Sequence, residues 1–199
     1  NYVNEKIANV QVLGAVDQPG FYDLSKYRDL KDLIDNLVFI DAYPWLAVLE
    51  QFDENKLKSS SILFSLDDPT TYKSIKLLPN SRIYFADLET RSFDVNSMSS
   101  SLIRDYSLTL NHKGESLILP VYGRYSVSSF IDYLGLDMSD VSEIATYVSP
   151  LESIVINDDY KKMEYIAQKY NTVSFRSPEN SLITVSVSGA VEFPGPYTL

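Results

Sequence analysis

One fifteen-residue segment occurs twice in this chain, and the repeat restricts the possible fold more than any other feature. Residues 10–24 read VQVLGAVDQPGFYDL and residues 185–199 read VSVSGAVEFPGPYTL, at a constant offset of 175. Nine of the fifteen positions are identical. Because so dense a match does not arise by chance, we expect the same structural unit to begin at both places.

The repeated segment has the pattern of a β-hairpin. Val10, Val12 and Val16 alternate with other residues, as in a strand with one buried face. Pro19-Gly20 favours a type II turn, because proline fixes φ near −65° and glycine accepts the positive φ that follows. A glycine inside a strand marks a bulge or a close backbone approach. We therefore expect structural roles for the repeated glycines and prolines: Gly14, Pro19, Gly20, Gly189, Pro194 and Gly195.

The pattern V-x-V-x-G-A-V-x-x-P-G-x-Y-x-L, followed by an amphipathic helix, resembles the opening of an SLBB domain, a soluble ligand-binding β-grasp module. The match covers residues 10–24 and 185–199 and extends, with fewer matching positions, over 25–88 and 104–184. Tandem copies of this module occur in bacterial polysaccharide export proteins of the outer-membrane auxiliary family. The resemblance implies an α+β fold of tandem β-grasp domains, each a small mixed sheet with one packed helix.

We divide the chain into four parts on this basis. Residues 1–90 form a first SLBB-like domain, 91–103 a serine-rich linker, 104–184 a diverged second SLBB-like domain, and 185–199 the first hairpin of a third. The linker, which we expect to contain a short ordered piece, could bend, whereas the second domain runs into the third hairpin with almost no linker. Since a two-stranded hairpin is marginal alone, we expect the last hairpin to dock on the second domain or on a neighbouring chain.

Helices and strands can be placed within each domain. Residues 30–37 carry leucine and isoleucine at helical spacing, and a strand is expected from about Leu46 after a loop around Pro44. In the second domain, Ser126 can cap a helix that ends at Gly135. Helical spacing predicts a further helix over 159–170. The similarity of 178–183 to 79–83 places the closing strand of this domain after Pro178.

Composition and charge exclude several classes of function. The chain has 199 residues, and 27 acidic against 17 basic residues give a net charge of −10. Nucleic acids and anionic membrane surfaces need a basic footprint, so neither is an expected partner. No apolar run approaches the roughly 18 residues of a membrane span, so we expect no direct membrane insertion. The chain begins at Asn1 and stops two strands into a repeat, which indicates part of a longer protein.

The residues needed for catalysis or cofactor binding are scarce. His112 is the only histidine, and its place in a polar turn is typical of a solvated residue. Cysteine is absent, so thiolate metal sites and disulfides are excluded. No phosphate-binding glycine pattern, EF-hand or nucleophile elbow occurs. We expect no enzyme activity, no metal and no cofactor.

Sugar-binding sites commonly stack exposed aromatic rings on sugar rings. The best candidates for glycan contact are Tyr43 and Trp45, which flank Pro44, followed by Tyr122 and Tyr125. The alternative for Trp45 is that it fills the core of the first domain. If the pair Tyr43 and Trp45 bound glycan, alanine at both positions should abolish binding without unfolding. If both side chains belonged to the core, the double variant should unfold.

Two functions remain open. The resemblance implies a periplasmic, non-catalytic module of a polysaccharide export protein, active in capsule or exopolysaccharide secretion. Its partners would be polysaccharide and other subunits of the export assembly, with a homo-oligomer as one arrangement, and its parent would be associated with the outer membrane. The alternative is a soluble glycan- or solute-binding module outside any export channel.

Overall fold

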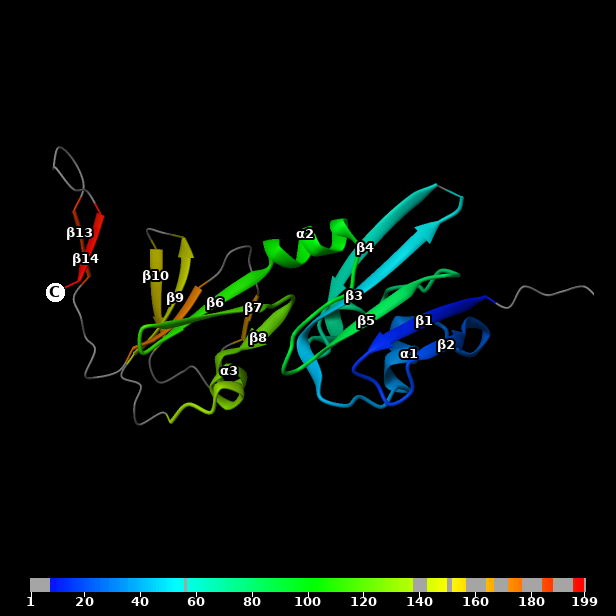
Figure 1. Ribbon diagram of the computed structural model, residues 1–199, viewed down its shortest axis with the longest axis horizontal. Helices are drawn as coiled ribbons and strands as arrows, with labels where there is room; N and C mark the ends of the chain where they lie inside the picture. Colours follow the sequence, from blue (N-terminus) through cyan, green and yellow to red (C-terminus); the bar gives the residue numbers. More distant parts are fainter. Residues whose placement is uncertain are drawn as a thin grey trace, which may run out of the picture.

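The computed structural model describes residues 8–55, 57–137, 143–149, 152–156, 164–166, 172–176, 184–187 and 195–198. The fold is mixed α+β, which confirms the predicted class at this level. Two five-stranded mixed sheets account for most strands, and α2 (Ser97–Asp105) lies between them in the view of Figure 1. The described part also contains two small two-stranded sheets.

The first sheet has the strand order β2-β1-β5-β3-β4. β1 pairs in parallel with β5, and the other neighbours are antiparallel. The helix α1 follows β2 in the chain, so a hairpin is followed by a helix as the sequence predicted. The bounds are β1 Asn9–Gly14, β2 Gly20–Asp23, α1 Leu30–Asp35, β3 Ala42–Asp53, β4 Lys58–Phe64 and β5 Arg82–Asp87, with single 3-10 turns at Leu24–Lys26 and Pro69–Thr71.

The second sheet repeats this topology. Its order is β10-β9-β12-β6-β7, and β6 pairs in parallel with β12 while the other neighbours are antiparallel. Read from the opposite edge, this is the order and direction of the first sheet, with β6 in the place of β1 and β12 in the place of β5. The bounds are β6 Ser107–His112, β7 Glu115–Pro120, α3 Val127–Leu134, β9 Glu143–Ser149, β10 Glu152–Ile156 and β12 Thr172–Arg176.

The C-terminal repeat forms the same hairpin as the N-terminal one. β13 (Thr184–Val187) pairs with β14 (Gly195–Thr198) antiparallel, with Val185 opposite Tyr197. In the first copy Val10 stands opposite Tyr22, and every other pair of the two ladders also differs by 175. The sequence repeat is therefore also a repeat of strand register. Gly189 and Pro194 lie outside the described residues, and Gly195 begins β14.

Gly14 ends β1 where two backbones meet closely. Its φ is +93°, and a Cβ there would lie 1.8 Å from the carbonyl oxygen of Phe85 on β5. The neighbouring Ala15 amide donates to that same carbonyl at 2.9 Å. Only glycine allows this approach, which is the role expected for a glycine inside the motif. The type II turn predicted at Pro19-Gly20 is wrong, because Gly20 has φ +152° and begins β2 opposite Val12.

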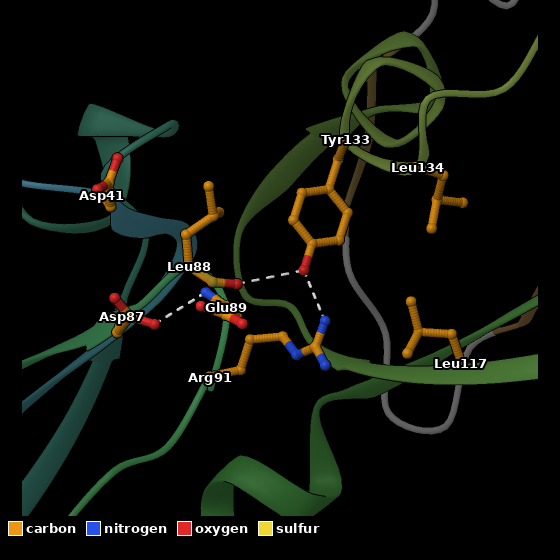
Figure 2. A pocket seen from close by; sticks show the side chains of 8 residues that line it. All are labelled: Asp41, Asp87, Leu88, Glu89, Arg91, Leu117, Tyr133 and Leu134. Atoms are coloured by element: carbon orange, nitrogen blue, oxygen red, sulfur yellow. Dashed lines mark hydrogen bonds between the residues drawn. The ribbon is translucent and has the colours of Figure 1, made fainter.

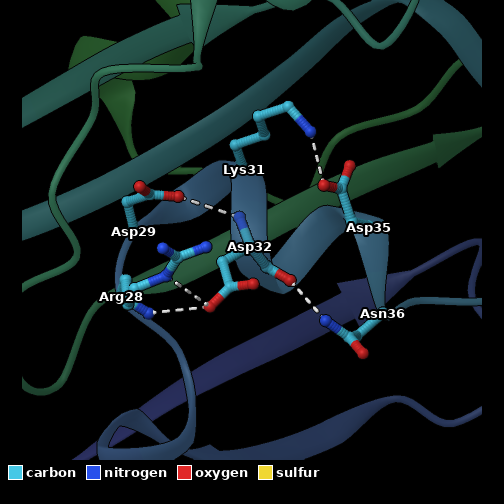
Figure 3. Close-up of polar contacts among 6 residues, drawn as sticks. All are labelled: Arg28, Asp29, Lys31, Asp32, Asp35 and Asn36. Atoms are coloured by element: carbon cyan, nitrogen blue, oxygen red, sulfur yellow. Dashed lines mark hydrogen bonds and ion pairs between the residues drawn. The ribbon is translucent and has the colours of Figure 1, made fainter.

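The helix α1 is short and is held at its start by acidic side chains. Asp29 accepts a hydrogen bond from the Asp32 amide at 2.9 Å, as an N-cap residue does. Lys31 and Asp35 form an i,i+4 ion pair on the exposed side (Figure 3). Leu30, Leu33 and Ile34 are buried on the other side. The helical prediction for this segment is confirmed.

Two separate groups of buried side chains fill the molecule. One lies between α1 and the first sheet and includes Val10, Val12, Leu33 and Ile83. The other lies on the opposite face of the first sheet and continues into the second domain, as Trp45, Val48, Leu110 and Phe130 belong to one cluster. The two domains therefore share a core rather than touching at a thin contact.

Several predicted elements are corrected. The predicted helix over 159–170 is wrong at Glu164–Ile166, which form strand β11 against β8 (Arg124–Ser126). This pairing brings Tyr165 to 5.9 Å from Tyr125, between ring centroids, so a tertiary contact overrides the helical spacing. The rest of 159–170 lies outside the described residues. The strand predicted from about Leu46 begins at Ala42 and includes Pro44.

The closing strand of the second sheet is also not where the sequence comparison put it. The strand in the place of β5 is β12, Thr172–Arg176, which precedes Pro178. The similarity between 178–183 and 79–83 therefore does not mark equivalent positions, and residues 177–183 separate β12 from β13. In α3, termination at Gly135 is confirmed by its left-handed φ of +61°. Ser126 makes no capping hydrogen bond, because its hydroxyl pairs with that of Ser128 at 2.5 Å.

The segment predicted as a serine-rich linker contains the helix α2. Asn96 caps it by accepting from the Ser99 amide at 3.0 Å. The Ser99 hydroxyl is fully buried and bonds Glu50 on β3 at 2.8 Å and Ser61 on β4 at 2.7 Å. These bonds fix α2 to the first sheet, so this part of the segment is anchored.

Candidate functional site

The indole ring of Trp45 lies at the junction of the two domains. It comes from β3 and contacts two rings of α3, with centroid distances of 4.7 Å to Phe130 and 5.2 Å to Tyr133. Tyr43 packs edge-on against the same indole at 5.4 Å. Aromatic pairs in such tilted and edge-on geometries contribute beyond the area they bury. The junction is therefore built around one aromatic cluster.

Backbone hydrogen bonds reinforce this junction. The Tyr43 hydroxyl donates to the carbonyl of Pro120 at 2.9 Å, and the Tyr122 amide donates to the carbonyl of Trp45 at 2.9 Å. A tyrosine hydroxyl is protonated at neutral pH, and burial raises the pKa of Tyr43 further above its ordinary value, so this donor persists into alkaline solution. These two bonds join β3 of the first domain to the last residue of β7 and to the segment that follows it.

Asp68 makes a further contact across the junction. Its carboxylate accepts from the Arg124 amide at 2.8 Å and from the Thr70 amide at 3.1 Å. Burial acts to raise the pKa of Asp68, but a hydrogen bond from the Thr70 hydroxyl at 2.5 Å, together with these two amide hydrogen bonds, outweighs it and holds that pKa below its usual value. The adjoining Gly123 has φ +81°, and a Cβ there would lie 2.7 Å from Thr71. The two domains thus approach too closely at this point for any larger residue.

The aromatic residues predicted to contact glycan take part in this junction. Tyr43, Trp45 and Tyr125 are 0%, 2% and 1% exposed, so no ring face is open to a sugar. Tyr122 is half-buried, and its ring packs edge-on against Tyr106 at 4.9 Å. The geometry favours the alternative reading of Trp45 as a core residue, with the difference that this core is shared by both domains.

A cleft of about 500 Å³ opens beside the junction (Figure 2). Asp41, Asp87 and Glu89 supply carboxylates from the first domain, and Tyr133 of α3 faces them from the second. Arg91 donates to the Tyr133 hydroxyl at 2.6 Å, and this hydroxyl donates to the Leu88 carbonyl at 3.3 Å. The remaining lining residues are apolar: Leu88, Leu117 and Leu134.

The acidic residues of this cleft differ in the hydrogen bonds that they already make within the protein. Asp87 is used structurally, since it accepts from the amides of Glu89 and Thr90, both at 2.9 Å. Asp41 has φ +47° and is exposed, and its carbonyl accepts from the Leu88 amide at 2.7 Å. No group of three or more potential metal ligands occurs in the part of the chain that the structure describes. The cleft can form hydrogen bonds to a polar ligand. No motif in the sequence singles out its lining residues.

His112 is not among the residues that line this cleft. It ends β6, and its ring packs edge-on against Phe175 of β12 with centroids 6.4 Å apart. Its Nδ1 atom is buried and has no hydrogen-bond partner among the described residues. The side chain thus borders the core of the second domain instead of extending from a solvated turn.

Comparison with known proteins gave no family assignment. No protein-family model matches the chain, and no curated protein matches its sequence. None of the helices in the described ranges has the length and apolar character needed to cross a membrane.

Proposed function

We propose that this chain is a periplasmic, non-catalytic part of a polysaccharide export protein, built from tandem β-grasp modules of the SLBB type. The observation that carries the proposal is the repeated hairpin, which has nine of fifteen residues identical and the same strand register in both copies. The resemblance to SLBB domains rests on the sequence of this hairpin.

The two five-stranded sheets support the tandem arrangement. A β-grasp module is a mixed sheet that opens with a hairpin and packs one helix on one face. Both sheets have the same strand order and directions, with a helix between the hairpin and the rest of the sheet in the chain. This similarity supports reading the second sheet as a diverged copy of the first, with its own β11–β8 pair added.

The junction supports a role as a spacer or subunit contact. The shared core around Trp45 and the bonds to Pro120 and Asp68 hold the first two modules in one orientation. A fixed orientation suits a protein that transmits position between neighbouring subunits or across a distance. In such an assembly the modules contact polysaccharide and other subunits and catalyse nothing.

In this proposal, a third module would attach to the second domain in a different way from that in which the second attaches to the first. Tyr84 of β5, which pairs with Val48, is buried in the cluster of side chains that the two domains share. The register of β12 places Ser174 at the equivalent position, where its hydroxyl accepts from Asn111 at 3.3 Å. A polar position replaces an aromatic one, so the same apolar docking cannot be repeated there.

An in-frame deletion of residues 8–176 from the gene of the parent protein, in its native organism, tests the proposal. We expect polysaccharide to disappear from the cell surface and to be retained inside the cell, because export and not synthesis would fail. Surface and periplasmic polysaccharide are quantified in the deletion strain and in the same strain carrying the intact gene. Unchanged surface polysaccharide would contradict the export role and would favour a soluble glycan-binding module.

A further inference from the structure

A second groove, of about 520 Å³, runs along α2, and its charge is opposite to that of the chain as a whole. One wall is formed by Arg91, Phe93 and Val95, and the other by residues of α2 that include Arg104. None of its lining residues is acidic, although the chain has 27 acidic against 17 basic residues. A groove with two arginines and no carboxylate therefore departs from the average surface of this protein.

The local backbone structure explains why both walls of the groove border the same space. Arg91, Phe93 and Val95 come from a segment that is neither helix nor strand, and all three side chains line the same space. Positions 97, 100 and 104 are spaced three and four apart on α2, which places them on one helix face. Ser99 is not among the groove residues and is bonded to Glu50 and Ser61, which fixes the helix as a wall.

The two arginines have donors available for a ligand. The Arg91 side chain lies between this groove and the cleft beside Tyr133, and it lines both. Its one hydrogen bond within the described residues goes to the Tyr133 hydroxyl, which positions its guanidinium group and leaves other N–H donors. Arg104 is exposed and lies in the last turn of α2. Guanidinium groups recognise carboxylates through paired, charge-assisted hydrogen bonds.

The rest of the groove suits a ring that carries hydroxyl groups. Phe93, Val95 and Ile103 are partly buried and pack on the shared core, so they form the apolar part of both walls. Ser97 and Ser100 add hydroxyls that can donate and accept. An apolar surface with hydroxyl groups at its side and two guanidinium groups matches one face of a pyranose ring with a carboxylate substituent.

We propose that this groove binds an anionic saccharide, a sugar unit that carries a carboxylate such as a uronate. The choice of a sugar rests on the proposed export function, while the negative charge of the ligand follows from the two arginines. Because the chain carries a net charge of −10, the rest of its surface repels an acidic polysaccharide on average. The groove would then be a specific site of contact with the polysaccharide and not one of many nonspecific contacts.

The test uses trigalacturonate as the probe, titrated into the whole chain at low ionic strength and followed by calorimetry and by NMR shifts of labelled protein. We expect binding with amide shifts concentrated in residues 91–104, and weaker binding as salt is added. Maltotriose, which has similar rings and no charge, should bind at least about tenfold more weakly. Inorganic phosphate, which has charge and no ring, should not displace the trisaccharide at equal concentration.

Matched variants distinguish binding in the groove from a general effect of the net charge of the protein. Arg104→Gln should weaken trigalacturonate binding about tenfold, because it removes one guanidinium–carboxylate pair. Arg28→Gln removes the same charge from an exposed arginine beside α1 and should leave the affinity unchanged. Circular dichroism melting curves check that both variants remain folded.

Three results would overturn this inference: no binding by the unaltered chain at millimolar probe, equal losses in both variants, or equal affinity for maltotriose. Displacement by phosphate would also reject the saccharide as the ligand and reduce the groove to an anion site. A failure here is distinct from a failure of the export role, since the deletion experiment measures where polysaccharide accumulates in cells.

Discussion

Trp45→Ala should cost the chain about 3–5 kcal/mol in free energy of unfolding, the range found when a large buried aromatic is truncated. Trp45 is 2% exposed and contacts Tyr43, Phe130 and Tyr133, so alanine would leave a cavity between β3 and α3. Since this cavity lies in the core that both domains share, the second domain should lose its support first. Urea unfolding followed by circular dichroism measures the loss.

Trp45→Phe provides the control for this experiment. The indole Nε1 atom is buried and has no hydrogen-bond partner among the described residues. Phenylalanine keeps an aromatic ring and removes an unsatisfied donor, so we expect a loss of only about 1–2 kcal/mol. Equal stability of Trp45→Ala and the unaltered chain would show that the two domains are not joined through this side chain.

Replacing both Tyr43 and Trp45 by alanine distinguishes the two interpretations of these aromatic residues, as glycan contacts or as core residues. If Trp45 and Tyr43 were a sugar-binding pair, their replacement would weaken glycan binding and leave stability intact. Their burial leads us to expect the reverse, with unfolding as the main effect. A stable double variant that no longer binds glycan would restore the binding-module hypothesis.

Gly14→Ala should destabilise the first domain by more than about 4 kcal/mol, which few single substitutions do. The new Cβ would lie 1.8 Å from the Phe85 carbonyl oxygen, so β1 and β5 would have to separate. Alanine at φ +93° adds about 1–2 kcal/mol of backbone strain. Unfolding can be followed by the fluorescence of the single tryptophan at the junction.

Gly114→Ala is the matched control, because it changes the backbone strain without the collision. Gly114 has φ +81°, and no heavy atom lies within 4 Å of a Cβ placed there. We expect a loss of about 1–2 kcal/mol from the strain alone. If the two alanine variants lost equal stability, the close approach of Gly14 to β5 would not be needed for the fold.

The repeated hairpin was predictable because each of its features is local. Alternating valines, a glycine at a close approach and a turn are encoded within fifteen residues, and both hairpins form with one register. The helices α1 and α3 were predictable for the same reason, since capping by Asp29 and termination at Gly135 involve neighbours in the chain.

The elements that depended on distant partners were missed. Glu164–Ile166 have a helical pattern but pair with β8, and Thr172–Arg176 become the central strand because β6 and β9 are available on both sides. Helix α2 was hidden in a serine-rich segment, where Ser99 is buried by partners more than thirty-five residues away. Local periodicity carries no information on such partners.

The candidate site was the least predictable part. Aromatic residues near a proline suggested a sugar-binding surface, yet Tyr43, Trp45 and Tyr125 are buried because the second domain covers them. The groove residues Arg91 and Arg104 are thirteen positions apart and share no motif. They face one space only because α2 folds back beside residues 91–95.

Our account depends on the second sheet being a copy of the first, and the parallel pairing of β6 with β12 is its most direct test. In NMR spectra of the labelled chain, we expect backbone nuclear Overhauser contacts between residues 109–112 and 172–175, with Leu110 opposite Val173. The equivalent contacts in the first sheet, between Val12 and Ile83, serve as the internal standard. Contacts in the first sheet without those between β6 and β12 would contradict the tandem arrangement.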